Sequence, residues 1–118
     1  MIHGQFLSDQ GELLITDAMR TESALERMRG LLGRSPLQGS EALWITPCNS
    51  VHSLFMGYPL DLVYLNRRLS VVKIIERMKP WRFSARPAAH SVIELAAGGA
   101  TTVGITTGTQ LVWQPCAG

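Results

Sequence analysis

Two apolar runs separated by three polar residues constrain the fold of this chain more than any other feature. Asp61–Leu65 and Leu69–Ile75 are rich in branched apolar residues, and the connection between them, Asn66–Arg68, is short and polar. Runs of this length and composition are typical of strands, and a short polar connection between two of them favours a β-hairpin. The centre of the chain therefore predicts a strand-rich fold.

Four further segments have the composition of short strands bounded by turn-forming residues. They are Leu13–Thr16, Ala42–Thr46, Ser91–Leu95 and Gln110–Trp113. No regular structure is predicted over Lys79–Pro87, which contains two prolines. Only a brief helical turn is predicted near Ala96–Ala100.

One helix is predicted after the strand at Leu13–Thr16. Its N-cap is either Thr21 or Ser23, and Ser23 has Glu26 three residues later, which is the spacing of a capping box. A glycine in the left-handed conformation can end the helix, at Gly30 or Gly33. The apolar positions of the helix favour a face packed on the core over a groove for a partner. These positions are Leu25, Met28 and Leu32.

About six short strands and one helix predict a mainly β (α+β) fold, a small barrel or sandwich with the N-terminal helix packed against it. The chain has 118 residues, which predicts one domain spanning residues 1–118. Apolar residues form 46% of the chain and charged residues 17%, which excludes a disordered tail. No apolar run approaches the roughly 20 residues that cross a bilayer. The N-terminal residues lack the pattern of a secretion signal, so the expected location is the cytoplasm.

The cysteines and histidines do not have the spacing of a metal site. Two cysteines and three histidines occur, and no CxxC or HExxH pattern joins them. In a reducing compartment both cysteines are expected to be free thiols. We therefore predict no metal site and no cofactor. The residues are Cys48, Cys116, His3, His52 and His90.

Positive charge is concentrated in residues 67–86. Seven basic residues and one acid give this segment a net charge of +6, whereas the rest of the chain, with four basic and eight acidic residues, carries −4. Such an asymmetry marks either a binding face for anions, nucleic acid included, or a solvated face of the sheet. The candidates for anion binding are Arg67, Arg68, Arg77, Lys79 and Arg82.

Three motifs, in order along the chain, resemble a known family. They are Glu26–Arg34 with Ala18 before it, Val51–Met56 followed by Tyr58–Leu65, and Ile93–Gly98. Together they resemble the domain-of-unknown-function family 192 of bacteria and archaea, over roughly residues 13 to 113. The resemblance implies a compact, strand-rich fold and brings no agreed activity. The family's last turn usually pairs glycine with aspartate, whereas this chain has Gly108–Thr109.

The segment Pro47–Asp61 is the predicted functional surface, because it gathers polar and aromatic side chains between strong strands. Together with one aromatic residue of the basic loop, it supplies the side chains expected to contact a ligand or partner. These are Asn49, His52, Phe55, Met56, Tyr58 and Trp81. The alternative for the aromatic residue of the loop is that it tucks into the end of the sheet.

Cys48, His52 and Asp61 are the candidates for catalysis in this segment. A thiol nucleophile needs a nearby base, and a carboxylate often orients that base. Residues four apart in a strand lie about 13 Å apart, so a couple of Cys48 and His52 requires a turn at Asn49–Ser50. The structural alternatives are a buried thiol beside a hydrogen-bonded imidazole, and an Asp61 that accepts backbone N–H bonds from the turn that precedes it.

Glu94 interrupts the otherwise apolar run Val92–Leu95. Either its side chain faces water, or it points inward and needs a partner, because an unpaired buried carboxylate is very costly. Arg27 and Arg29 are the expected partners in the second case.

The leading hypothesis is a non-enzymatic binding module for a small molecule or a protein partner, which uses Pro47–Asp61. The second is a hydrolase or transferase that uses Cys48 with His52. The third is nucleic-acid binding through residues 67–86.

Overall fold

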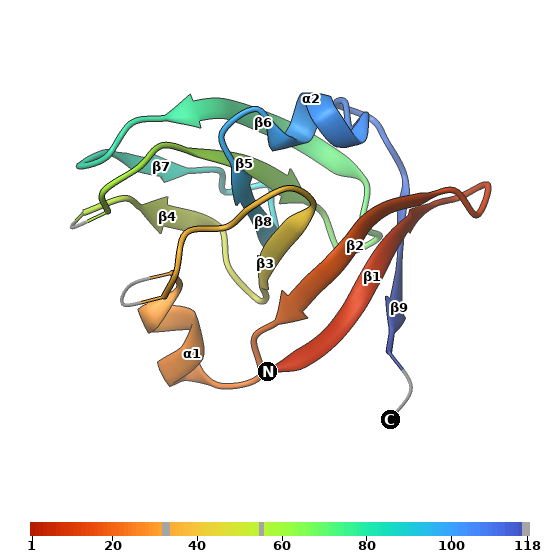
Figure 1. Ribbon diagram of the computed structural model, residues 1–118, viewed down its shortest axis with the longest axis horizontal. Helices are drawn as coiled ribbons and strands as arrows, with labels where there is room; N and C mark the ends of the chain where they lie inside the picture. Colours follow the sequence, from red (N-terminus) through yellow and green to blue (C-terminus); the bar gives the residue numbers. More distant parts are fainter. Residues whose placement is uncertain (32–33, 55, 117–118) are drawn as a thin grey trace.

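The predicted hairpin forms the centre of the observed structure, a computed structural model that describes residues 1–31, 34–54 and 56–116. The described residues form nine strands and two helices (Figure 1). The strands are β1 (Ile2–Ser8), β2 (Leu13–Arg20), β3 (Glu41–Ile45), β4 (Ser50–His52), β5 (Leu60–Leu65), β6 (Val71–Met78), β7 (Phe83–Ala85), β8 (Ser91–Ala96) and β9 (Leu111–Pro115). The helices are α1 (Ala24–Arg29) and α2 (Gly99–Val103). All six predicted strands, the hairpin and the helical turn at α2 are confirmed.

Seven strands form one mixed sheet in the order β6-β5-β8-β3-β2-β1-β9. The pair β2–β3 is parallel and the other pairs are antiparallel. The sheet curls until its two edges meet at one end, where Ser70 bridges Gln110 and the Leu111 N–H donates to the Leu69 carbonyl. Beyond this bridge β6 and β9 diverge (Figure 1). The sheet is therefore not closed into a barrel, and the predicted barrel or sandwich is wrong in this detail.

Three strands were not predicted, and each has a physical reason. In β1, Gly4 interrupts the pattern because the Trp113 ring occupies the space beside it; a Cβ at this position would lie 2.5 Å from that ring. The other two, β4 and β7, form a separate two-stranded sheet of three residues each. The prediction of no regular structure over Lys79–Pro87 is wrong at β7. Such short strands carry too little periodicity to be recognised locally.

Buried Ser53 fixes the chain before β7 to the end of β4. The Ser53 hydroxyl donates to the Lys79 carbonyl at 2.7 Å and accepts from the Arg82 N–H at 2.8 Å. The backbone N–H groups of Ser53 and Trp81 complete the contact. A pair of three-residue strands is marginal by itself, so these bonds help to hold it against the larger sheet.

The core lies on both faces of the large sheet, as shown by β5, in which all six residues are buried. Side chains alternate along a strand, so Val63 and Leu65 pack on the inner face of the curl, while Leu62 and Tyr64 pack on the outer face. The outer face is covered in part by the β4–β7 sheet, whose Ser84 hydroxyl meets the Tyr64 hydroxyl at 2.9 Å. The radius of gyration is 12.8 Å, close to the roughly 13 Å of one compact domain of this size.

Helix α1 differs most from its prediction. Its capping box is confirmed, since Ser23 and Glu26 exchange both bonds, and the helix ends at Gly30 with φ +52°. However, none of its residues is buried, and Leu25 and Met28 are each 75% exposed. The predicted apolar face is therefore not in the core; Leu32 and Gly33 lie outside the described residues. The half-buried side chains of α1 are instead the polar Glu26 and Arg27.

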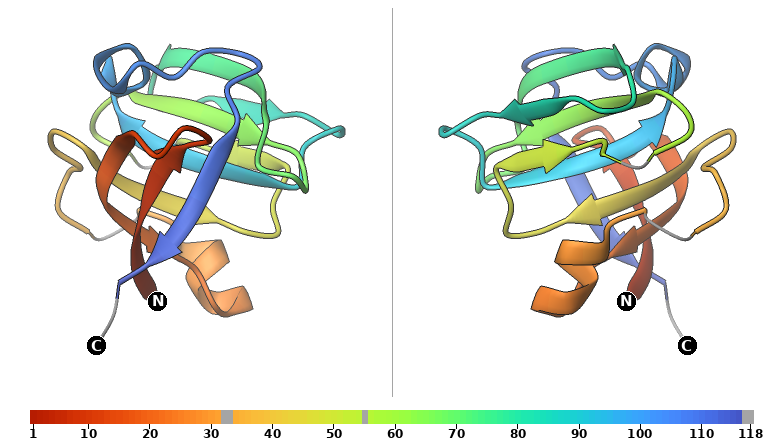
Figure 2. Two further views of the ribbon diagram at one scale, coloured as in Figure 1. Left: turned by 90° about the vertical axis from the view of Figure 1, so that its right-hand side faces the viewer. Right: turned by 90° about the vertical axis from the view of Figure 1, so that its left-hand side faces the viewer.

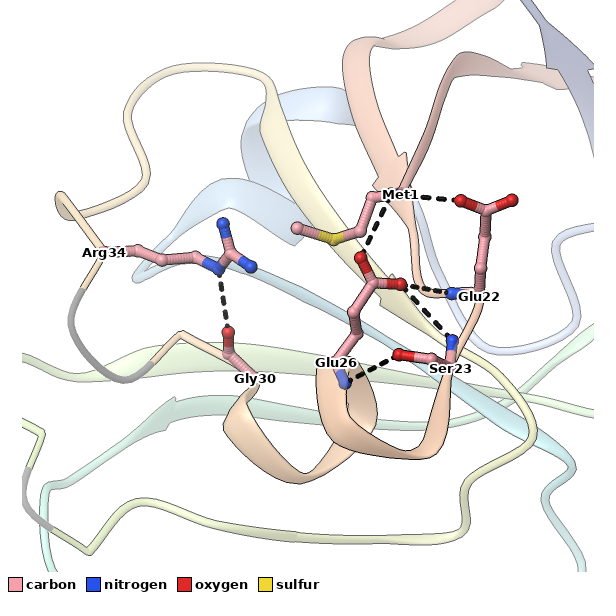
Figure 3. Close-up of polar contacts among 6 residues, drawn as sticks. All are labelled: Met1, Glu22, Ser23, Glu26, Gly30 and Arg34. Atoms are coloured by element: carbon pink, nitrogen blue, oxygen red, sulfur yellow. Dashed lines mark hydrogen bonds and ion pairs between the residues drawn. The ribbon is translucent and has the colours of Figure 1, made fainter.

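Polar contacts hold α1 beside the sheet (Figures 1 and 3). The ammonium of Met1 lies 3.0 Å from a Glu26 carboxylate oxygen and 3.1 Å from one of Glu22. After the helix, the Arg34 guanidinium donates to the Gly30 carbonyl at 3.1 Å. Neither helix of the described chain has the length and apolarity that would let it cross a membrane.

Candidate ligand-binding site

A small pocket opens between the end of α1 and the strand β4. Arg27 and Gly30 line it from the helix side, Cys48 and His52 line it from the β4 side, and Glu94 of β8 contributes a carboxyl group. Its volume is about 60 Å³. The predicted segment Pro47–Asp61 thus forms one wall of a pocket whose other walls come from distant parts of the sequence.

Cys48 and His52 line this pocket, but the thiol is not activated. The Cys48 Sγ donates a hydrogen bond to the Ser50 carbonyl at 2.9 Å. Burial raises the pKa of the Cys48 thiol, the hydrogen bond to Ser50 partly offsets this rise, and Glu94 raises the pKa while Arg27 lowers it by smaller amounts. A raised pKa disfavours the thiolate, which is the nucleophilic form.

Asp61 points away from the pocket, to the inner face of the sheet. Its two carboxylate oxygens accept the backbone N–H groups of Arg77 at 2.9 Å, Gly98 at 3.1 Å and Ala100 at 3.0 Å. Arg77 has φ +53°, and Gly98 precedes α2. Asp61 therefore ties an irregularity of β6 to the start of α2. Asp61 thus does not converge with Cys48 and His52, as a catalytic group of the three would require.

Glu94 is the acid that lines the pocket instead. Its residue is 4% exposed, and burial raises the pKa of its carboxyl group to about 7. Among the described residues no hydrogen bond or ion pair reaches this carboxyl group, so Arg27 does not pair with it. Arg29 lines the same pocket. Gly30 lies close, since a Cβ there would be 3.7 Å from the Glu94 Oε1. The inward alternative for Glu94 is thus correct, without the expected partner Arg27.

The other predicted binding residues divide between the pocket and the surface. Met56 is buried and lines the pocket. Tyr58 is half-buried against the outer core, and burial, with a smaller contribution from Glu94, raises the pKa of its hydroxyl. Asn49 is exposed, and its carbonyl accepts the Arg86 N–H at 2.8 Å. Trp81 is 56% exposed and so does not tuck into the sheet. Phe55 lies outside the described residues.

The candidates for anion binding do not gather in one place. Arg67 and Arg68 lie in the turn before β6, whereas Arg77, Lys79 and Arg82 lie at or beyond its far end. A strand of eight residues separates these groups, or roughly 25 Å at about 3.3 Å per residue. The net charge of +6 in the sequence therefore does not form one basic patch.

Sequence reasoning named Glu94 but did not choose between its two orientations, and it missed Gly30 as a wall of the pocket. The sequence signal for the pocket was the acid Glu94 inside the apolar run Val92–Leu95. No group of three or more histidine, cysteine, aspartate or glutamate side chains in the described ranges could hold a metal ion.

Comparisons with known proteins agree with this fold. The model of the family described as Uncharacterized ACR, domain-of-unknown-function family 192, matches residues 6–113. A UPF0127 protein of Pyrococcus furiosus is 28% identical over 111 residues, which cover 88% of this chain and 92% of that protein.

Two crystal structures share the fold. One is a protein from Sinorhizobium meliloti 1021, described as a "putative transcription regulator (R01717)", with a TM-score of 0.80 and 16% identity over 95% of this chain and 92% of that chain. The other is a protein of unknown function from Novosphingobium aromaticivorans, with a TM-score of 0.72 and 21% identity over 94% of this chain and 84% of that chain. At these identities the likeness concerns the fold alone.

Proposed function

The chain belongs to domain-of-unknown-function family 192, and from that premise we propose that it is a non-enzymatic binding module for a small polar ligand with a protonated amine. The Glu94 pocket is the proposed site. The observation that carries the proposal is the buried Glu94 carboxyl group, which lines a pocket and has no donor among the described residues. A buried acid in this situation is costly to keep, and such groups are concentrated at functional sites.

The size of the pocket limits the ligand. One water molecule needs about 10–15 Å³ of this kind of volume, so about 60 Å³ accommodates a group of roughly five non-hydrogen atoms. This is the size of a small amino acid or of the amine-bearing end of a larger molecule.

The charges around the pocket favour a ligand with both signs. The Glu94 carboxylate can accept hydrogen bonds from an ammonium group, whereas Arg27 and His52 can donate to an anion. A zwitterion can bind to the Glu94 carboxylate through its ammonium group and to Arg27 and His52 through its anionic group. The raised pKa of Cys48 gives no comparable support to the nucleophile hypothesis.

Isothermal titration calorimetry with three probes tests the proposal: glycine as the zwitterion, ethylammonium as the cation and propionate as the anion. We expect glycine to bind saturably and more tightly than propionate. Glu94→Gln should weaken glycine binding by about tenfold or more, because a hydrogen bond to a charged group contributes about 1.5–3 kcal/mol. Binding near pH 7 should also release protons, since an ammonium group favours the ionised form of a carboxyl group whose pKa is about 7.

Glu12→Gln is the matched control, because it removes the same charge from an exposed position in the β1–β2 turn. Glycine affinity should not change in this variant. Equal binding of propionate and glycine, or an unchanged affinity in Glu94→Gln, would contradict the proposal.

A further inference from the structure

A second, larger cavity is lined by residues of the inner side of the curled sheet. Strand β9, which contributes Trp113 to it, lies beside β1 (Figure 2, left). Its volume is about 660 Å³, within the usual range of roughly 300–1,000 Å³ for ligand pockets. Arg20, Trp44 and Trp113 line it from β2, β3 and β9, and Arg67 and Ser91 complete the wall. None of its lining residues belongs to the Glu94 pocket.

Two of the residues that line this cavity, Trp44 and Trp113, belong to a cluster of three aromatic rings. The ring centroids of Phe6, Trp44 and Trp113 are 5.0–5.1 Å apart from one another. The Arg20 guanidinium carbon lies 5.9 Å from the centroid of each indole ring. No ion pair of Arg20 occurs within the described ranges, so the rings hold its positive charge at the cavity without neutralising it.

Three of the residues that line the cavity have a buried polar atom without a hydrogen-bond partner among the described residues. Four buried side-chain polar atoms have no hydrogen-bond partner in the part of the chain that the structure describes. Three of them belong to residues that line this cavity: the Nε1 atoms of Trp44 and Trp113, and the Oγ of Ser91. Trp44 is 6% exposed and Ser91 is fully buried. Because these atoms are buried, a ligand in the open cavity does not reach them, and the polar groups that it can contact include the guanidinium groups of Arg20 and Arg67.

The net charge of the residues around the cavity is positive. Arg67 adds a second guanidinium group at its edge. The one acid that lines it, Glu22, lies 3.1 Å from the Met1 ammonium and is partly neutralised there. Donors and positive charge therefore outweigh acceptors and negative charge around this cavity.

We propose that this cavity is a second binding site, which takes a small organic oxyanion with a flat apolar part. The oxyanion accepts hydrogen bonds from Arg20 and Arg67, while the apolar part lies against the partly exposed ring of Trp113. A carboxylate and a phosphate monoester share this chemistry.

Fluorescence titration tests the proposal, because two of the three tryptophans of the chain line the cavity. The probes are benzoate and phenyl phosphate, with benzyl alcohol as the neutral analogue and benzylammonium as the cationic one. We expect a saturable change with at least one anion, and the stronger of the two identifies the oxyanion. Failure of both anions, or equal binding of benzyl alcohol, would overturn the proposal.

Two neighbouring arginines provide the matched control. Arg67 lines the cavity and Arg68 does not, although both are exposed and lie in the same turn. Arg67→Gln should weaken anion binding by about threefold to tenfold, as expected for loss of one charged contact near the surface, while Arg68→Gln should leave it unchanged. Equal losses in the two variants would show attraction to the general surface charge and would overturn the proposal.

Arg20→Gln should weaken binding by about tenfold or more, provided that circular dichroism shows the variant to be folded. Glu94→Gln should leave anion binding at the cavity lined by Trp44 and Trp113 unchanged. This last result separates failure of the second site from failure of the amine pocket.

Discussion

Two buried carboxyl groups lie in neighbouring strands and have opposite environments. In the β5–β8 ladder, Asp61 pairs with Leu95, and the next pair is Leu62 with Glu94. The two acids are thus one register position apart, but they point to opposite faces of the sheet. Asp61 accepts three backbone N–H bonds, whereas no donor among the described residues reaches Glu94. A fully hydrogen-bonded buried acid supports the fold, and an unpartnered one next to a pocket indicates a site.

Side chains alternate between the two faces of the sheet along each strand, and this alternation supplies residues to both proposed sites. In β3, Trp44 lines the inner cavity and its neighbour Ile45 lines the outer pocket. In β8, Ser91 lines the inner cavity and Glu94 the outer pocket. One sheet therefore presents an arginine-lined cavity on one face and a carboxyl group in a pocket on the other.

The largest effect is expected at Asp61. Asp61→Asn leaves one acceptor oxygen for three N–H donors, and hydrogen bonds to a charged group contribute about 1.5–3 kcal/mol each. We expect the free energy of unfolding to fall by about 3 kcal/mol or more, measured by urea denaturation. Asp17→Asn, at an exposed position of β2, should change it by less than about 0.5 kcal/mol. Equal effects of the two substitutions would refute the structural role of Asp61.

The same chemical change at Glu94 should have the opposite sign and should depend on pH. Burial raises the pKa of Glu94 from 4.5 to about 7 in the folded protein. The folded state therefore binds a proton that the unfolded state has lost, and the contribution of Glu94 to stability falls as the pH rises from about 4.5 to about 7. The resulting loss is about 3 kcal/mol above pH 7, at 1.36 kcal/mol per pKa unit.

Glu94→Gln removes the ionisation. Its free energy of unfolding, relative to the parent chain, should be nearly equal at about pH 4.5 and higher by up to about 3 kcal/mol at about pH 8.5. Urea denaturation at both pH values measures the difference. A difference that does not vary with pH would show that Glu94 remains ionised in the fold.

The smallest expected effect concerns Cys48, which lines the same pocket as Glu94. Burial raises the pKa of its thiol, so alkylation by iodoacetamide near neutral pH should be slower than at the exposed Cys116. Mass spectrometry of the two cysteine-containing peptides measures both rates. Faster alkylation at Cys48 than at Cys116 would instead support the nucleophile hypothesis.

Glu94→Gln should modestly increase the alkylation rate of Cys48, because it removes a neighbouring negative charge that raises the pKa of the thiol.

The sequence by itself determined the features that depend on neighbouring residues. The β5–β6 hairpin follows from two apolar runs around Asn66–Arg68, and the start of α1 follows from the spacing of Ser23 and Glu26. The segment Pro47–Asp61 was predicted as a functional surface from its polar and aromatic residues, and Cys48, His52 and Met56 of this segment line the Glu94 pocket. Its role in binding stays a prediction. These features are local, and local propensity and side-chain hydrogen bonds specify them.

Only the tertiary structure decided which face of the sheet each residue occupies and what meets it there. Asp61 was a candidate for catalysis or for accepting backbone N–H bonds from the preceding turn, and its carboxylate accepts such bonds from β6 and from the start of α2 instead of that turn. Leu25 and Met28 had helical spacing, yet their side of α1 points outward. The cavity between Trp44 and Trp113 joins residues from β3 and β9, which no local pattern connects. The physical reason is that strand register assigns every side chain to a face, and register depends on partners far away in the chain.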